Sequence, residues 1–165
     1  MKRNQIVTFW LVGPKTSVPG ADCALSAESA AWVVSLDDPA GKCNVAASTT
    51  VEPRIVEVYG PGSAAANIAI SGVAADGTAA KSVSFNGYGQ PVRTGKPLTR
   101  IDITHDNSDT RRLRVEISAS GSIRMCDRAF DVAATPATRA PATPETTMTQ
   151  RQRSPAAASM PGASP

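Results

Sequence analysis

Arg111–Asp127 reads RRLRVEISASGSIRMCD, and this stretch decides the fold. Apolar and polar residues alternate on both sides of Ala119–Gly121, as they do in two half-buried strands joined by a short loop. A three-residue loop with Gly121 at positive φ keeps the apolar residues of both strands on one face, whereas a two-residue turn would mix the two faces. The expected register pairs Ile117 with Ile123, Val115 with Met125 and Glu116 with Arg124. We therefore predict a β-hairpin whose apolar face, which includes Leu113, points inward.

The same register gathers basic residues on the solvent face of the hairpin. They are Arg112, Arg114, Arg124 and Arg128, with Glu116 as the only acid of the hairpin on this face. Each arginine could contact a phosphate without reading sequence, which makes DNA a candidate partner. The alternative is a solvated strand face on which Glu116 pairs with Arg124, an interaction worth little when exposed. No aromatic residue lies between the arginines, so single-stranded bases have no platform on which to stack.

Length and composition favour one domain of modest stability. The chain has 165 residues, which suffices for one domain with a real core but is short for two. Hydrophobic residues make up 41% of the chain and aromatic residues only 4%, so the core must consist mainly of aliphatic side chains. The formal net charge of +3 permits an anionic partner without requiring one.

Further alternating runs, each bounded by turn residues, predict a sheet domain without an amphipathic helix. They lie at Ile6–Val12, Trp32–Leu36, Arg54–Tyr59, Asn67–Val73, Lys81–Phe85 and Leu98–Thr104. The Asp76-Gly77 turn signal predicts that the fourth and fifth of these runs form a hairpin, and residues 14–30 read as a long loop. From residue 133 onward Ala, Thr, Pro and Ser predominate, which is typical of disorder. We therefore predict a mainly β domain at 1–132 and a disordered tail at 133–165.

The three cysteines do not show the close spacing of a zinc or redox site. An odd number in an exported protein suggests one disulfide and one remaining thiol, and we expect Cys23 to pair with Cys43, which leaves Cys126. Three reduced structural thiols are the alternative, because Cα distances cannot be read from sequence. We expect no metal.

No set of residues predicts catalysis. Gly60-Pro61-Gly62 follows a strand, but a dinucleotide site needs a helix directly after the glycines, and Asn67–Val73 alternates like a strand instead. His105 is the one histidine of the chain and lies in a polar turn with no nucleophile assigned to it. We therefore expect no enzyme activity and no cofactor.

Three stretches resemble the globular domain of minor pilins and pseudopilins of the GspH/FimT type. They are MKRNQIVT at 1–8, VSFNGYGQP at 83–91 and SASGSIRMCD at 118–127, and the resemblance covers roughly residues 1–130. It implies an α+β pilin fold that lacks most of its N-terminal helix, whose first half anchors the protein in the membrane and whose second half packs on the sheet. The chain as printed shows no signal or membrane segment. We therefore expect a head fragment or a start codon assigned too far downstream, with Ile6, Phe9 or Val33 left without cover.

The resemblance also implies a function. Members of the family are structural subunits that assemble with other pilins or pseudopilins in a type IV pilus or a type II secretion pseudopilus, in the cell envelope. Some FimT-like members bind DNA for uptake through a Gly-Arg-x-Arg turn in the last hairpin. This chain reads Gly121-Ser122-Ile123-Arg124 there, so only the second arginine of that pattern is present. The resemblance thus implies filament assembly first and DNA binding second.

Overall fold

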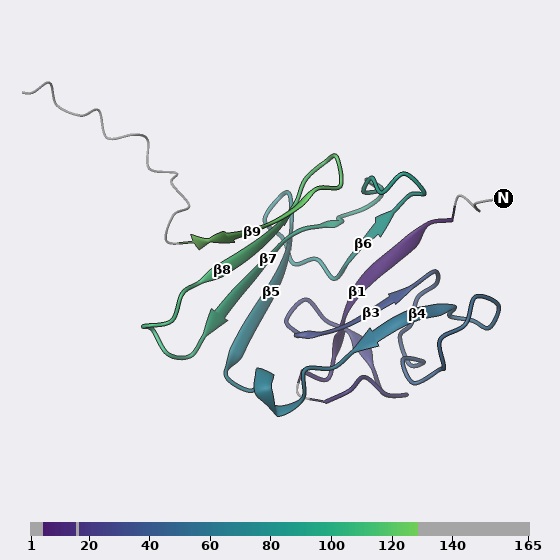
Figure 1. Ribbon diagram of the computed structural model, residues 1–165, viewed down its shortest axis with the longest axis horizontal. Helices are drawn as coiled ribbons and strands as arrows, with labels where there is room; N and C mark the ends of the chain where they lie inside the picture. The colour runs from purple at the N-terminus through teal and green to yellow at the C-terminus, as the bar shows by residue number, and fades with distance from the viewer. Residues whose placement is uncertain (1–4, 16, 129–165) are drawn as a thin grey trace, which may run out of the picture. The chain divides into compact units, whose positions relative to one another are not determined.

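Short alternating runs form the strands of the computed structural model, which describes residues 5–15 and 17–128 (Figure 1). The strands are β1 (Val7–Gly13), β2 (Ala24–Leu25), β3 (Ala31–Ser35), β4 (Ile55–Tyr59), β5 (Ile68–Ala74), β6 (Ser82–Phe85), β7 (Leu98–His105), β8 (Leu113–Ile117) and β9 (Ile123–Asp127). The helical element among these residues is a single 3-10 turn, η1 (Gly62–Ala65). The predicted mainly β fold is therefore confirmed. The predicted tail, 133–165, lies outside the described residues.

The described strands form two antiparallel sheets. The first sheet has the order β2-β1-β3-β4, and β6 also pairs with β1. The second has the order β5-β7-β8-β9. The loop predicted at 14–30 thus contains one short strand, β2, which pairs with the end of β1.

The hairpin of β8 and β9 has the predicted register. Ile117 lies opposite Ile123, Val115 opposite Met125 and Glu116 opposite Arg124. Gly121 has a φ of 88°, and a Cβ at this position would lie 2.0 Å from the carbonyl oxygen of Gly89. Glycine is therefore required here both by the backbone conformation and by the contact with the 86–91 loop.

The predicted hairpin of β5 and β6 is wrong, although its turn exists. The amide of Gly77 donates to the carbonyl of Ala74, and the amide of Ala80 donates to the carbonyl of Gly72. The chain then leaves β5 and crosses to the first sheet, where β6 pairs with β1, while β5 pairs with β7. A Cβ on Gly72 would lie 2.4 Å from the carbonyl oxygen of Ala80 and 2.8 Å from Leu11 Cδ1. A glycine in β5 therefore allows the two sheets to approach closely at the crossing point.

Two buried clusters lie on opposite faces of the first sheet, because neighbouring residues of a strand point to opposite sides. One contains Val12, Ala31, Val33, Ile55, Cys23 and Cys43. The other contains Leu11 and Val83 from the first sheet and Ala74, Ala80 and Leu98 from the segments around the second. This second cluster joins the two sheets.

The predicted disulfide between Cys23 and Cys43 is present, with a Cα–Cα distance of 6.1 Å. Both cysteines are almost fully buried in the first cluster. Cys126 is a partly buried free thiol. The disulfide therefore fixes the long connection between β3 and β4 to the segment that precedes β2.

An ion pair holds the other end of this connection. Arg54 has a φ of 53°, and its Nε donates to Asp37 Oδ2 at 2.7 Å while Nη2 donates to Oδ1. The guanidinium lowers the pKa of Asp37 mainly through these hydrogen bonds; desolvation opposes the shift, and the charge of Arg54 adds a smaller lowering. The pair closes the loop that leads into β4.

Candidate functional site

An apolar groove opens between the two sheets. Its volume is about 170 Å³, and its lining comes from β1 and β6 on one side and from β7, β8 and β9 on the other. The lining residues are Phe9, Val83, Phe85, Ile101, Val115, Ile117 and Ile123. All of these side chains are hydrocarbons. A ligand in the groove would therefore bury apolar surface but would make no hydrogen bond with a lining side chain.

The outer wall of the groove is uncovered. Ile123 and Met125 lie on the same face of β9 as expected, but their side chains are 63% and 67% exposed. The predicted direction of these side chains is therefore correct, whereas the described residues do not bury them. Exposed large apolar side chains beside an apolar groove are typical of an interaction site.

An aromatic row extends the apolar surface across the first sheet. The ring centroids of Phe9 and Trp32 lie 5.7 Å apart, and those of Trp32 and Tyr59 lie 5.4 Å apart. The three rings come from β1, β3 and β4 and lie on the sheet face that carries the groove, since Trp32 is opposite both Leu11 and Tyr59. Tyr59, at the far end, is 46% exposed. The row and the groove form one apolar surface, which we call the apolar trough.

The three residues expected to lack cover have different positions. Phe9 is half-buried and lines the groove. Ile6 is 51% exposed but precedes β1, and strand alternation gives it the side opposite Phe9. Val33 is fully buried, so its prediction is wrong. Val33 faces the buried cluster that contains the disulfide, and the sequence pattern did not indicate that this cluster covers it.

The opposite face of the second sheet carries the predicted basic group, together with an acid that the sequence analysis missed. Asp102 of β7 lies opposite Arg114, and Arg114 Nε donates to its Oδ1 at 2.7 Å. Nε of Arg128 lies 3.8 Å from the same oxygen, and Nε of Arg100 lies 3.4 Å from Oδ2. Arg114 is 13% exposed on its side chain. This carboxylate therefore neutralises much of the charge that the hairpin alone would present.

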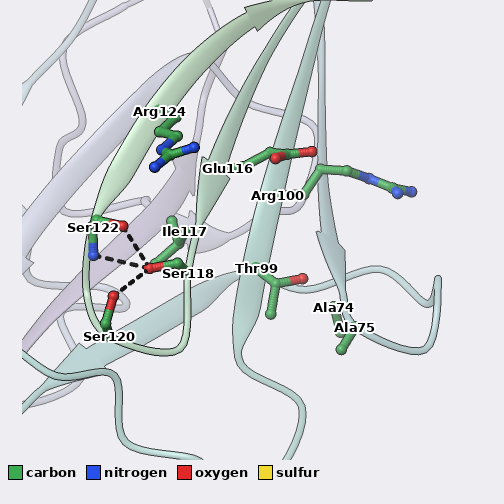
Figure 2. Close-up of a pocket in the computed structure, with 10 residues that line it drawn as sticks. All are labelled: Ala74, Ala75, Thr99, Arg100, Glu116, Ile117, Ser118, Ser120, Ser122 and Arg124. Carbon is green, nitrogen blue, oxygen red and sulfur yellow. Dashed lines mark hydrogen bonds between the residues drawn. The ribbon is translucent and has the colours of Figure 1, made fainter. Parts of the chain in front are cut away.

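Arg124 differs from these arginines. It is exposed and has no ion pair within the part of the chain that the structure describes, and Glu116, directly opposite, is 3.9 Å from Arg114 Nη1. Figure 2 shows Arg124 and Arg100 on opposite sides of Glu116, beside an open hollow of about 550 Å³. Ser118 Oγ lies 2.9 Å from Ser120 Oγ in the turn below them. Arg112 is also exposed, so two of the four predicted arginines remain available to an anionic partner.

The other candidate motifs form no site. His105 is exposed at the end of β7, and its Nδ1 accepts a hydrogen bond from the amide of Asn107 at 2.9 Å. The glycines at 60–62 lead into the 3-10 turn η1 and then into β5. Within residues 5–15 and 17–128 no group of His, Cys, Asp and Glu side chains could hold a metal ion. Nor does any helix described there have the length and hydropathy needed to cross a bilayer.

Comparisons of this chain with protein-family models, with curated proteins and with solved structures gave no match.

Proposed function

We propose that this chain is the head of a GspH/FimT-type minor pilin or pseudopilin, a structural subunit of a type IV pilus or a type II secretion pseudopilus. The observation that carries the proposal is the apolar trough. It lies between the two sheets, and large apolar side chains at its margin, Ile123 and Met125, are exposed. A sheet face of this kind is stable in water when another element covers it.

A helix is the element that suits the trough. Its two walls come from different sheets, so a cylinder laid between them contacts both, and an apolar stripe on a helix matches an apolar lining. A strand could extend only one sheet at its edge and would leave the other wall bare. The stem of a pilin is a helix that packs on the head in this manner. The stem would also supply the membrane anchor and the contacts with other subunits.

The disulfide supports a place in the cell envelope. Buried disulfides persist in oxidising compartments such as the periplasm and are rare in the cytosol. The bond between Cys23 and Cys43 lies in the buried cluster that contains no groove residue. A head domain exposed to the periplasm would keep it.

The test begins with the codons upstream of Met1. We expect them to encode, in frame, a short basic leader and an apolar helix. The protein made with this segment should enter the membrane fraction and copurify with other pilins.

Thiol labelling then tests the position of the helix. Ile123→Cys in a Cys126→Ser background should react quickly in the chain as printed and at least tenfold more slowly in the extended protein, because the helix covers it. Val51→Cys, also in an exposed position at 58%, is the matched control and should react equally in both. Equal labelling of Ile123→Cys in both forms, or an extended protein that stays out of the membrane fraction and finds no pilin, would overturn the proposal.

DNA binding is the second candidate, favoured by Arg124 and Arg112, which are exposed on the same face of the hairpin and have no ion pair among the described residues. The chain should then shift labelled duplex at low salt and release it steeply as salt rises. Combining Arg124→Ala with Arg112→Ala should abolish most of the shift, whereas Arg114→Ala should matter less because Asp102 already holds that side chain. Absence of a shift at low salt would remove this candidate.

A further inference from the structure

Among the edge strands of the described fold, β9 and β4 have sequences that complement each other. β9 pairs with β8 alone, and β4 pairs with β3 alone. The β9 edge reads Ile123-Arg124-Met125 and the β4 edge reads Val56-Glu57-Val58. Each is a single charge between two apolar residues, and the two charges have opposite signs.

The hydrogen-bond pattern shows which backbone groups face the free edge of β9. The amide of Ser118 donates to the carbonyl of Ser122, and the amide of Arg128 donates to the carbonyl of Arg112. Since bonded residues alternate in an antiparallel pair, Arg124 and Cys126 also bond inward to β8. The N–H and C=O groups of Ile123 and Met125 therefore point away from β8. The register of this pair has no bulge, so the edge is regular along its length.

The same reasoning applies to β4. The amide of Leu11 donates to the carbonyl of Lys81, on the side of β1 away from β3, so Trp10 and Val12 bond to β3. Trp32 and Val34 of β3 then bond to β4. Their partners in β4 are Tyr59 and Glu57, which leaves the backbone groups of Val58 directed outward. A bulge next to Ile55 displaces Val56, whose side chain is 53% exposed.

Neither charged side chain has an ion pair in the described part of the chain. Arg124 and Glu57 are both exposed. Most exposed strand edges carry a device that prevents pairing, such as proline or an inward charge. β9 has neither of these devices. In β4 the bulge disrupts only the beginning of the strand, so the regular part of the β4 edge is short.

We propose that the β9 edge of one copy pairs antiparallel with the β4 edge of a second copy. In this register Val58 lies opposite Ile123, Glu57 opposite Arg124 and Val56 opposite Met125. The apolar side chains then share one side of the joined sheets and the opposite charges share the other. Because the two edges differ, the contact is head-to-tail and each added copy offers a new free edge, so association continues beyond the dimer.

The biological use of this contact rests on the proposed filament function, but the contact itself depends on the two edges and not on the apolar trough. It is short, so it is weak between isolated heads and gains strength when other contacts hold the heads close together. The contact is therefore tested with the 165-residue chain itself. If the thiol-labelling test of the stem helix fails, the contact between the two edges is unaffected. If the contact between the edges is not found, the proposal of the stem helix is likewise unaffected.

Charge reversal tests the register. Sedimentation velocity of the 165-residue chain over a concentration series should show association beyond the dimer. Glu57→Arg alone and Arg124→Glu alone should each weaken it about tenfold, and an equimolar mixture of the two variants should restore it, because each supplies the edge that the other lacks. Glu28→Arg and Arg93→Glu, two exposed positions outside both edges, are the matched controls and should have no effect.

Cross-linking tests the geometry independently of affinity. Glu57→Cys and Arg124→Cys in one chain, with Cys126→Ser, place two thiols opposite each other at a position without backbone hydrogen bonds, where side chains approach most closely. Oxidation should give a ladder of dimers, trimers and longer species that reducing agent dissolves. A product that stops at the dimer would indicate a two-fold contact and overturn the proposal. A chain that stays monomeric in both experiments would overturn it as well.

Discussion

Loss of the disulfide between Cys23 and Cys43 should destabilise the folded domain by an amount that follows from the size of the loop it closes. The bond joins residues 20 positions apart. A closed loop of this size restricts the unfolded chain by an entropy equivalent to about 3 kcal/mol at room temperature. For a domain of this size such a loss lowers Tm by roughly 10 °C. Both cysteines are almost fully buried, so replacing them also removes packing contacts.

Urea unfolding and thermal unfolding by circular dichroism, each with and without dithiothreitol, measure this effect. Reduction should lower the stability of the natural chain and of Cys126→Ala by the same amount, because Cys126 is not in the bond. Cys23→Ala/Cys43→Ala should start near the reduced value, slightly below it for the lost packing, and should not respond to the reductant. Equal stability of the oxidised and reduced chains, or three titratable thiols in the unreduced protein, would refute the reasoning.

Three further perturbations test other parts of the fold. The pKa of Asp37 is lowered in the folded state, so its contribution to stability is present above the carboxylate's ordinary pKa and is lost as the pH falls through the lowered value; Arg54→Ala should reduce this acid sensitivity in urea titrations. Gly121→Ala should cost at least about 1–2 kcal/mol in chemical denaturation, because alanine resists positive φ and its Cβ would press on Gly89; an unchanged midpoint would disprove this requirement. Ile123→Ser should change the unfolding free energy of the chain as printed by less than about 0.5 kcal/mol, since the side chain is mostly exposed; a larger loss would mean that another segment covers it.

Local alternation and turn chemistry predicted most strands, and the reason is that these signals are short-range. The register of β8 and β9 follows from side-chain alternation and one glycine, all within Arg111–Asp127. The pairing of β5 with β7 could not be predicted in the same way. The Asp76-Gly77 turn is real, but the partner of β5 depends on how closely the sheets pack at Gly72, which is a tertiary effect.

The candidate surfaces show the same division between local and long-range information. The basic group of the hairpin was predictable, but Asp102, which neutralises part of it, belongs to a neighbouring strand ten residues or more away in sequence. Likewise, alternation predicted the direction of Ile123 and Met125 and said nothing about whether this chain covers them. Val33 was misplaced because the loop that buries it has no regular pattern of its own.

The two clusters on either side of the first sheet also differ in how they would respond to force. One is cross-linked covalently, whereas the other, which holds the second sheet, depends on side-chain packing alone. A mechanical force applied through β9 should therefore separate the second sheet first, while the first sheet stays folded. The cluster around the disulfide is then the part of the domain that is expected to stay folded when the second sheet is released.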